Sequence, residues 1–171
     1  MQSGSNTIRF SDRKVASPAF AELYAQGMAL VEETAAYLDG EGRKQAKGLS
    51  RAAATLYAAE SMRLTTRLMQ IASWLLLQRA FVNGEMTREQ VASEKSKIRL
   101  DATTAHADLT IWQDLPEHFK DLVQRSLRLQ TRVQRMDADL SSNPLEADAV
   151  DGGDNPVNAQ INLLKTAFGD R

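Results

Sequence analysis

Residues 49–83 decide the fold of this chain, and they read LSRAAATLYAAESMRLTTRLMQIASWLLLQRAFVN. Eight mostly apolar side chains recur here at alternating spacings of three and four, which places them on one stripe of an α-helix. This first stripe contains Tyr57, Ser61, Leu64, Leu68, Ile71, Leu75, Gln78 and Val82. At a rise of about 1.5 Å per residue, the helix spans on the order of 50 Å.

Two further apolar lines lie along the same helix. One contains Met62, Met69 and Leu76, and the other contains Trp74, Leu77 and Phe81. The last three turns are therefore apolar on nearly every side and must be covered from several directions. Because a three-helix bundle normally leaves part of each helix exposed, we expect the line of Trp74, Leu77 and Phe81 to form a two-fold dimer interface. The alternative is that the chain's own bundle surrounds this line.

A first helix is predicted to precede this stretch. Ser17 is suited to cap its free amides, Pro18 fits the first helical position, and Gly40 and Gly42 are expected to end it. Its apolar face contains Phe20, Leu23, Tyr24, Val31, Ala35 and Leu38. A basic connector around Gly48 then leads into the long helix, and this connector contains Arg43, Lys44, Lys47 and Arg51.

The long helix is expected to end at Asn83-Gly84, where left-handed backbone geometry is tolerated. Thr87 and Gln90 have the spacing of a capping box, which predicts a short helix carrying Val91 and Ile98. Residues 100–114 lose the periodicity and are expected to form a loop. A last long helix follows Leu115-Pro116, and its apolar seam contains Phe119, Leu122, Ser126, Leu129, Val133, Met136 and Leu140.

These patterns predict an all-α fold, an antiparallel bundle of three long helices with a short accessory helix between the second and the third. Residues 17–140 form the bundle domain, and residues 1–16 are expected to be flexible. Residues 141–171 should be a flexible acidic tether, because the stretch from Asp137 to Asp154 has six acidic and no basic residues. The tether ends in an amphipathic docking segment with Val157, Ile161, Leu164 and Phe168. This segment either folds back on its own bundle or lays its apolar face into a groove of another protein.

The composition limits the classes of function that are possible. The chain has 171 residues, a formal net charge of -1 and no cysteine, so it lacks thiolate chemistry and any overall attraction to polyanions. The polar start, residues 1–7, lacks the apolar core of a signal peptide. The densest apolar run, residues 71–77, is far shorter than the roughly 20 residues that a membrane span needs. We therefore expect a cytoplasmic protein without membrane insertion.

The side chains that carry catalysis are sparse. His106 and His118 show only a weak spacing signal, so we expect exposed structural histidines rather than metal ligands. Glu60 interrupts the apolar neighbourhood of the long helix, and a pair with Arg63 or Arg67, or a place at the bundle edge, explains it better than a general base. We therefore predict no enzymatic activity, no metal and no cofactor.

Four arginines line one face of the last helix. They are Arg125, Arg128, Arg132 and Arg135. This face is a candidate for contact with an acidic partner or with phosphates. The alternatives are an ordinary solvated face, or a contact in which the acidic tether lies on the arginines and acts as a brake.

The segment from Leu77 to Ile98 has the outline of a helix-turn-helix DNA reader. Glu89 and Glu94 of its second helix would face phosphates unfavourably, which makes nucleic-acid binding the weaker hypothesis. A passive structural dimerisation module is a further alternative.

Three segments of the helical body resemble the RcdA family, the regulators of CtrA degradation of alpha-class proteobacteria. They are residues 20–24 (FAELY), 56–68 (LYAAESMRLTTRL) and 72–80 (ASWLLLQRA). The resemblance extends over residues 17–140 by whole-segment similarity, and the family has no short catalytic motif.

The resemblance implies a homodimeric helical adaptor that helps the ClpXP protease destroy a cell-cycle response regulator and other substrates at the cell pole. It also implies two further partners, a receiver-domain protein of the CpdR type that primes the protease and a cyclic-dinucleotide effector protein of the PopA type. It assigns no catalytic residue and fixes no contact residue.

Overall fold

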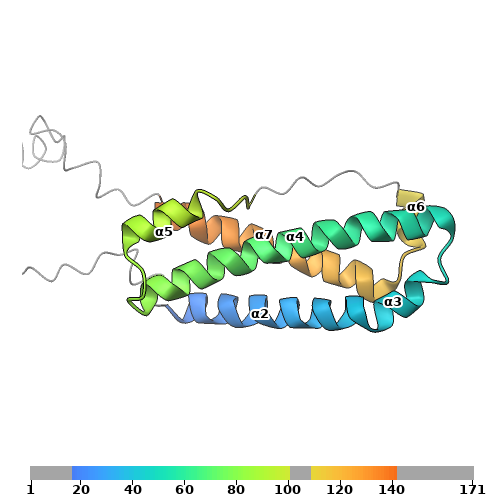
Figure 1. Ribbon diagram of the computed structural model, residues 1–171, viewed down its shortest axis with the longest axis horizontal. Helices are drawn as coiled ribbons and strands as arrows, with labels where there is room; N and C mark the ends of the chain where they lie inside the picture. Colours follow the sequence, from blue (N-terminus) through green and yellow to red (C-terminus); the bar gives the residue numbers. More distant parts are fainter. Residues whose placement is uncertain (1–16, 101–108, 142–171) are drawn as a thin grey trace, which may run out of the picture. The chain divides into compact units, whose positions relative to one another are not determined.

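The computed structural model of the chain describes residues 17–100 and 109–141, and this part of the chain is helical and contains no strand. The predicted all-α fold is confirmed. The helices are α2 (Pro18–Asp39), α3 (Glu41–Ala46), α4 (Arg51–Val82), α5 (Arg88–Lys95), α6 (Leu109–Gln113) and α7 (Glu117–Ser141) (Figure 1). By its internal contacts the chain divides into Met1–Ser141 and Ser142–Arg171, and all described residues lie in the first unit. None of the described helices is long and apolar enough to cross a membrane.

The long helices α2, α4 and α7 share one hydrophobic core, and each of them contacts the other two. Trp74 and Phe119 are the largest side chains that are fully buried. Aliphatic side chains from all three helices surround them, among them Leu23, Leu64, Ile71, Leu75, Leu122 and Val133. The three stripes that the sequence pattern predicted therefore meet in a single core.

The directions of the helices differ from the predicted bundle. Helix α2 runs antiparallel to α4, since Phe20 near its start packs on Trp74 near the end of α4, with ring centroids 6.3 Å apart. Helices α4 and α7 run in the same direction, because Tyr57 packs on Phe119 near their starts and Trp74 contacts Asp137 near their ends. In the expected antiparallel bundle, consecutive long helices alternate in direction.

The connection between α4 and α7 explains this correction. Helix α5 packs on the end of α4, and Lys95 at its last turn contacts Asp137 near the end of α7. Helix α6 stands at the opposite end, immediately before α7 begins (Figure 1). Helices α5 and α6 thus lie at opposite ends of the bundle, and α7 starts at the end where α4 starts, so it repeats the direction of α4.

Local signals set the helix ends as predicted. The Ser17 hydroxyl accepts a hydrogen bond from the Phe20 amide at 3.3 Å, and the Ser50 hydroxyl caps α4 in the same way. Thr87 and Gln90 form the reciprocal capping box of α5. Gly84 has a φ of 72°, the left-handed geometry that glycine adopts without steric cost.

Two short helices occupy segments that were expected to be irregular. Helix α3 lies in the predicted basic connector, and α6 lies in the predicted loop of residues 100–114. Gly42 does not end a helix but lies buried within α3, where a Cβ atom would stand 2.6 Å from the Tyr57 hydroxyl and 2.7 Å from Cε1 of Tyr37. Glycine is needed there because α3 approaches two tyrosine rings closely.

Candidate protein-binding surfaces

The first stripe of α4 faces the core of its own chain. Its members Leu64, Ile71 and Leu75 are fully buried, while Val82 at the end of the helix is 43% exposed. Trp74, which we had assigned to a dimer interface, is also completely buried. This placement corrects the expectation for Trp74, since a side chain with no exposed surface has none to offer to a second copy.

The Trp74 indole is fixed by a polar contact as well as by packing. Its Nε1 donates a hydrogen bond to Oδ1 of Asp137 at 2.7 Å, and the Lys95 ammonium lies 2.6 Å from the same oxygen. Leu77 and Phe81, the other two members of the expected interface, are partly exposed. The guanidinium of Arg88 lies over the Phe81 ring, 5.7 Å from its centroid.

The second apolar line of α4 is the one that faces outward. Met62, Met69 and Leu76 are 73%, 66% and 51% exposed, and they follow one another at intervals of seven residues. We call these three residues the methionine line. Scattered surface hydrophobics are ordinary, but three large ones in a row on one helix face mark a surface suited to a partner.

A groove lies at the end of the methionine line, between α4 and the chain around α5. It has a volume of about 590 Å³, and Leu76, Leu77, Ala80, Met86 and Ile98 are among its apolar lining residues. Leu76 belongs to both the line and the groove. The methionine line therefore meets the groove at Leu76.

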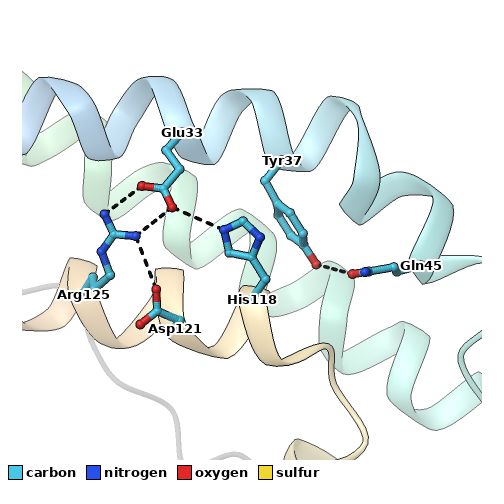
Figure 2. Close-up of polar contacts among 6 residues, drawn as sticks. All are labelled: Glu33, Tyr37, Gln45, His118, Asp121 and Arg125. Carbon is cyan, nitrogen blue, oxygen red and sulfur yellow. Dashed lines mark hydrogen bonds and ion pairs between the residues drawn. The ribbon is translucent and has the colours of Figure 1, made fainter.

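The four arginines of α7 do not share one role. Arg125 holds Glu33 of α2 through two hydrogen bonds of 2.7 Å, and it also donates to Asp121 at 3.3 Å (Figure 2). The hydrogen bond from Arg125 holds the pKa of Glu33 below its usual value, and the same bond raises the pKa of Arg125. This ion pair joins α2 to α7.

The other three arginines are exposed. Arg132 donates to the Oε1 atom of Gln26 on α2. Arg128 and Arg135 have no hydrogen bond or ion pair within the part of the chain that the structure describes. Arg125, Arg128 and Arg132 line a groove of about 400 Å³ between α2 and α7, whereas Arg135 does not. We call this the arginine groove; its role in binding stays a prediction.

Glu60 lies deeper than the expected bundle edge, and Arg67 is buried as well. Glu60 is 6% exposed and pairs with Arg63, as one of the two predicted pairings had it. Arg67 is 2% exposed and donates to the Ser126 hydroxyl at 2.8 Å, but its Nε has no hydrogen-bond partner within the described residues. Burial lowers the pKa of Arg67. The sequence pattern gave no sign of this buried cation, because arginine usually lies at the surface.

The polar contacts of His118 are structural. Its Nε2 lies 3.3 Å from Oε1 of Glu33, and its ring packs on Tyr37 with centroids 4.7 Å apart (Figure 2). His106 lies outside the described residues. Within residues 17–100 and 109–141, no group of three or more histidine, aspartate or glutamate side chains is arranged to hold a metal ion.

The segment with the outline of a DNA reader turns its basic side chains toward its own chain. Val91 of α5 is buried, Lys95 pairs with Asp137, and Arg88 stacks on Phe81. This arrangement leaves little free positive charge on α5. The predicted docking residues Val157, Ile161, Leu164 and Phe168 lie outside the described residues, so their role stays a prediction.

Comparisons with known proteins place the chain in a family. Residues 11–168 match the model of a family described as "Protein of unknown function (DUF1465)". No curated protein matches the chain. Among solved structures, the chain is similar to RcdA from Caulobacter crescentus CB15, with 49% identity and a TM-score of 0.60 over 72% of this chain and 92% of that chain. With this identity over nearly the whole length of that protein, the chain belongs to the RcdA family.

Proposed function

We propose that this chain is a non-enzymatic adaptor in regulated proteolysis, which binds partner proteins and helps deliver cell-cycle regulators to the ClpXP protease. The observation that carries the proposal is the 49% identity with RcdA over 92% of that protein. The exposed methionine line and the arginine groove support it, because an adaptor acts through surfaces that hold other proteins.

The partners follow from the same resemblance. We propose that a receiver-domain protein of the CpdR type primes the protease, that an effector protein of the PopA type binds the adaptor, and that a response regulator is the substrate. The site of action is the cytoplasm, concentrated at the cell pole. A tether ending in a docking segment would raise the effective concentration of the bound cargo near the protease.

A second copy of the chain is the proposed occupant of the methionine line. The three side chains recur at the seven-residue interval of helices that pack along each other, and small residues such as Thr66 and Ser73 alternate with them. Leu77 and Phe81, the partly exposed members of the expected interface, lie on the same helix. The dimer face thus moves from Trp74 to the methionine line.

Oligomeric mass tests this interface. Met69→Glu places a charge in the middle of the line, so we expect light scattering to give the mass of a monomer with an unchanged helical circular dichroism spectrum. Gln124→Glu adds the same charge at an exposed position of α7 and should keep the dimer mass. A dimer mass for Met69→Glu would show that the copies do not meet on this line.

A reconstituted degradation assay tests the adaptor function. Purified ClpXP, the priming protein and a fluorescent response-regulator substrate are combined with and without the full chain. We expect substrate loss to accelerate only when the chain is present. A second substrate that ClpXP degrades without an adaptor controls for protease activity and should be unaffected. Equal rates with and without the chain would contradict the proposal.

Truncation after Leu140 separates the tail from the helical body in the same assay. Because the truncation keeps every core residue among those that the structure describes, we expect the truncated chain to stay folded but to deliver substrate more slowly. An unchanged rate would remove the tail from the mechanism while leaving the adaptor function standing.

A further inference from the structure

The arginine groove combines an apolar floor with basic walls. Leu30 and Leu129 are buried beneath it, and Ala29 lies beside them. Arg128 and Arg132 are exposed along its α7 side. A volume of about 400 Å³ suits a few side chains of a docked segment rather than a whole helix. The groove therefore offers apolar contacts and positive charge to the same short segment of a ligand.

Among the described residues, the arginines of the groove are paired directly with carboxylates at one end only. Arg125 is paired with Glu33 and Asp121, so the positive charge at that end is balanced. Arg132 contacts the neutral amide of Gln26, whose own Nε2 donates to Glu22. Arg128 has no partner within the described part of the chain, which leaves the middle of the groove positive.

We infer that the arginine groove binds an acidic amphipathic segment of a partner protein. Carboxylates of that segment pair with Arg128 and Arg132, and its apolar side chains pack on the exposed Ala29 and on the small parts of Leu30 and Leu129 that reach the groove. Arginine is suited to this role because its planar fork holds a carboxylate through two parallel hydrogen bonds. The inference rests on the proposed adaptor function, since it states what chemistry a bound partner presents to this surface.

The same arginines would be the contact if the ligand were a nucleic acid, but the surroundings favour a peptide. Nucleic-acid sites need an extended run of cations that neutralises several phosphates. Here the positive stretch is short, because the carboxylates of Glu33 and Asp121 close one end of it. The apolar floor also matches leucine-like side chains better than a sugar–phosphate backbone.

Fluorescence anisotropy with a defined probe tests the inference. The probe is a labelled synthetic 14-residue peptide with leucines at spacings of three and four and glutamates between them. Its counterpart has glutamine in place of every glutamate. We expect the full-length chain to bind the acidic peptide and to bind the glutamine peptide at least about tenfold more weakly, because the ion pairs are absent.

A matched pair of charge reversals locates the site. Arg128 lies in the groove, so Arg128→Glu should weaken binding of the acidic peptide by about tenfold or more. Arg135 lies outside the groove on the same exposed face of α7, so Arg135→Glu should change the affinity by about twofold or less. Both positions are exposed, so both variants should keep the parent's unfolding midpoint. Arg128→Lys should restore part of the affinity, because charge returns without the planar fork.

Several results would overturn the inference. Equal weakening by Arg128→Glu and Arg135→Glu would indicate diffuse attraction without a site, and equal binding of the two peptides would show that charge plays no part. Tighter binding of duplex DNA that also depends on Arg128 would assign the groove to nucleic acid. The degradation assay reads the adaptor function separately. A chain that accelerates proteolysis but binds no acidic peptide would refute the groove and leave the adaptor in place.

Discussion

Replacing Trp74 should reveal whether it stabilises the chain itself or an assembly of two chains. The side chain has no exposed surface, packs on Phe20 and donates a hydrogen bond to Asp137. Trp74→Ala removes the whole indole from a closed core, which costs about 3–5 kcal/mol of the free energy of unfolding. Since small domains are stable by only about 5–15 kcal/mol, this is a large share of the total.

Trp74→Phe separates the hydrogen bond from most of the packing. It leaves an aromatic ring but deletes the donor to Asp137, whose charge raises the value of such a bond to about 1.5–3 kcal/mol. Lys95 stays 2.6 Å from the same carboxylate oxygen and offsets part of the loss. We therefore expect Trp74→Phe to lose about 1–2 kcal/mol, clearly less than Trp74→Ala.

The assay is chemical denaturation followed by helical circular dichroism, repeated at several protein concentrations. Val82→Ala is the control, because Val82 lies on the same helix, outside the methionine line, and is 43% exposed. Within the folded subunit its removal should cost within about 0.5 kcal/mol. If Trp74→Ala were as mild as Val82→Ala, or if its cost vanished on dilution, the assignment of Trp74 to the chain's own core would be refuted.

Three further outcomes follow from local features. Gly42→Ala should lower the free energy of unfolding by about 1–3 kcal/mol, because the added Cβ has no room beside the tyrosines. Gly48→Ala is the control and should be tolerated, since its Cβ would have its nearest contact at 3.6 Å. Equal stabilities of the two variants would contradict the packing account. Glu33 has a lowered pKa, so the stability it contributes is present above the ordinary glutamate pKa of about 4.3 and is lost as the pH falls through the lower folded value. As the pH is lowered from about 6 to about 2, the melting temperature should accordingly fall more steeply for the parent than for Glu33→Gln. Parallel curves of melting temperature against pH would refute the linkage. Thr87→Ala breaks the capping box of α5 and should speed amide exchange in that helix at a cost of about 1 kcal/mol, while unchanged exchange would show that packing of Val91 alone holds it.

The sequence predicted what depends on neighbours in the chain. The capping residues Ser17 and Thr87, the turn at Gly84 and the apolar seam of α7 were all placed correctly, because each signal acts over one or two turns. The stripe of α4 that faces the core was also identified. These predictions needed no knowledge of what packs against the helix.

The errors concern contacts between distant parts of the chain. Trp74 and Met69 are both large apolar residues in the second half of α4, where apolar side chains lie on more than one face, so periodicity alone could not say which one faces α7. Gly42 resembles a helix terminator until two tyrosine rings are seen against it. The burial of Arg67 depends on Ser126, which lies 59 residues further along the chain.

The parallel pairing of α4 and α7 has a consequence for how the chain acquires its structure. Helices α2 and α4 are joined by a short connection and run antiparallel, so they meet by closing a short loop. The α4–α7 contacts close loops of 59 and 63 residues, from Arg67 to Ser126 and from Trp74 to Asp137, and closing them carries a larger entropic cost. During synthesis, the α2–α4 hairpin therefore emerges first and exposes the indole of Trp74 until α7 arrives to cover it. Until α7 packs on the hairpin, the chain therefore exposes a hydrophobic surface around Trp74 that the folded protein buries.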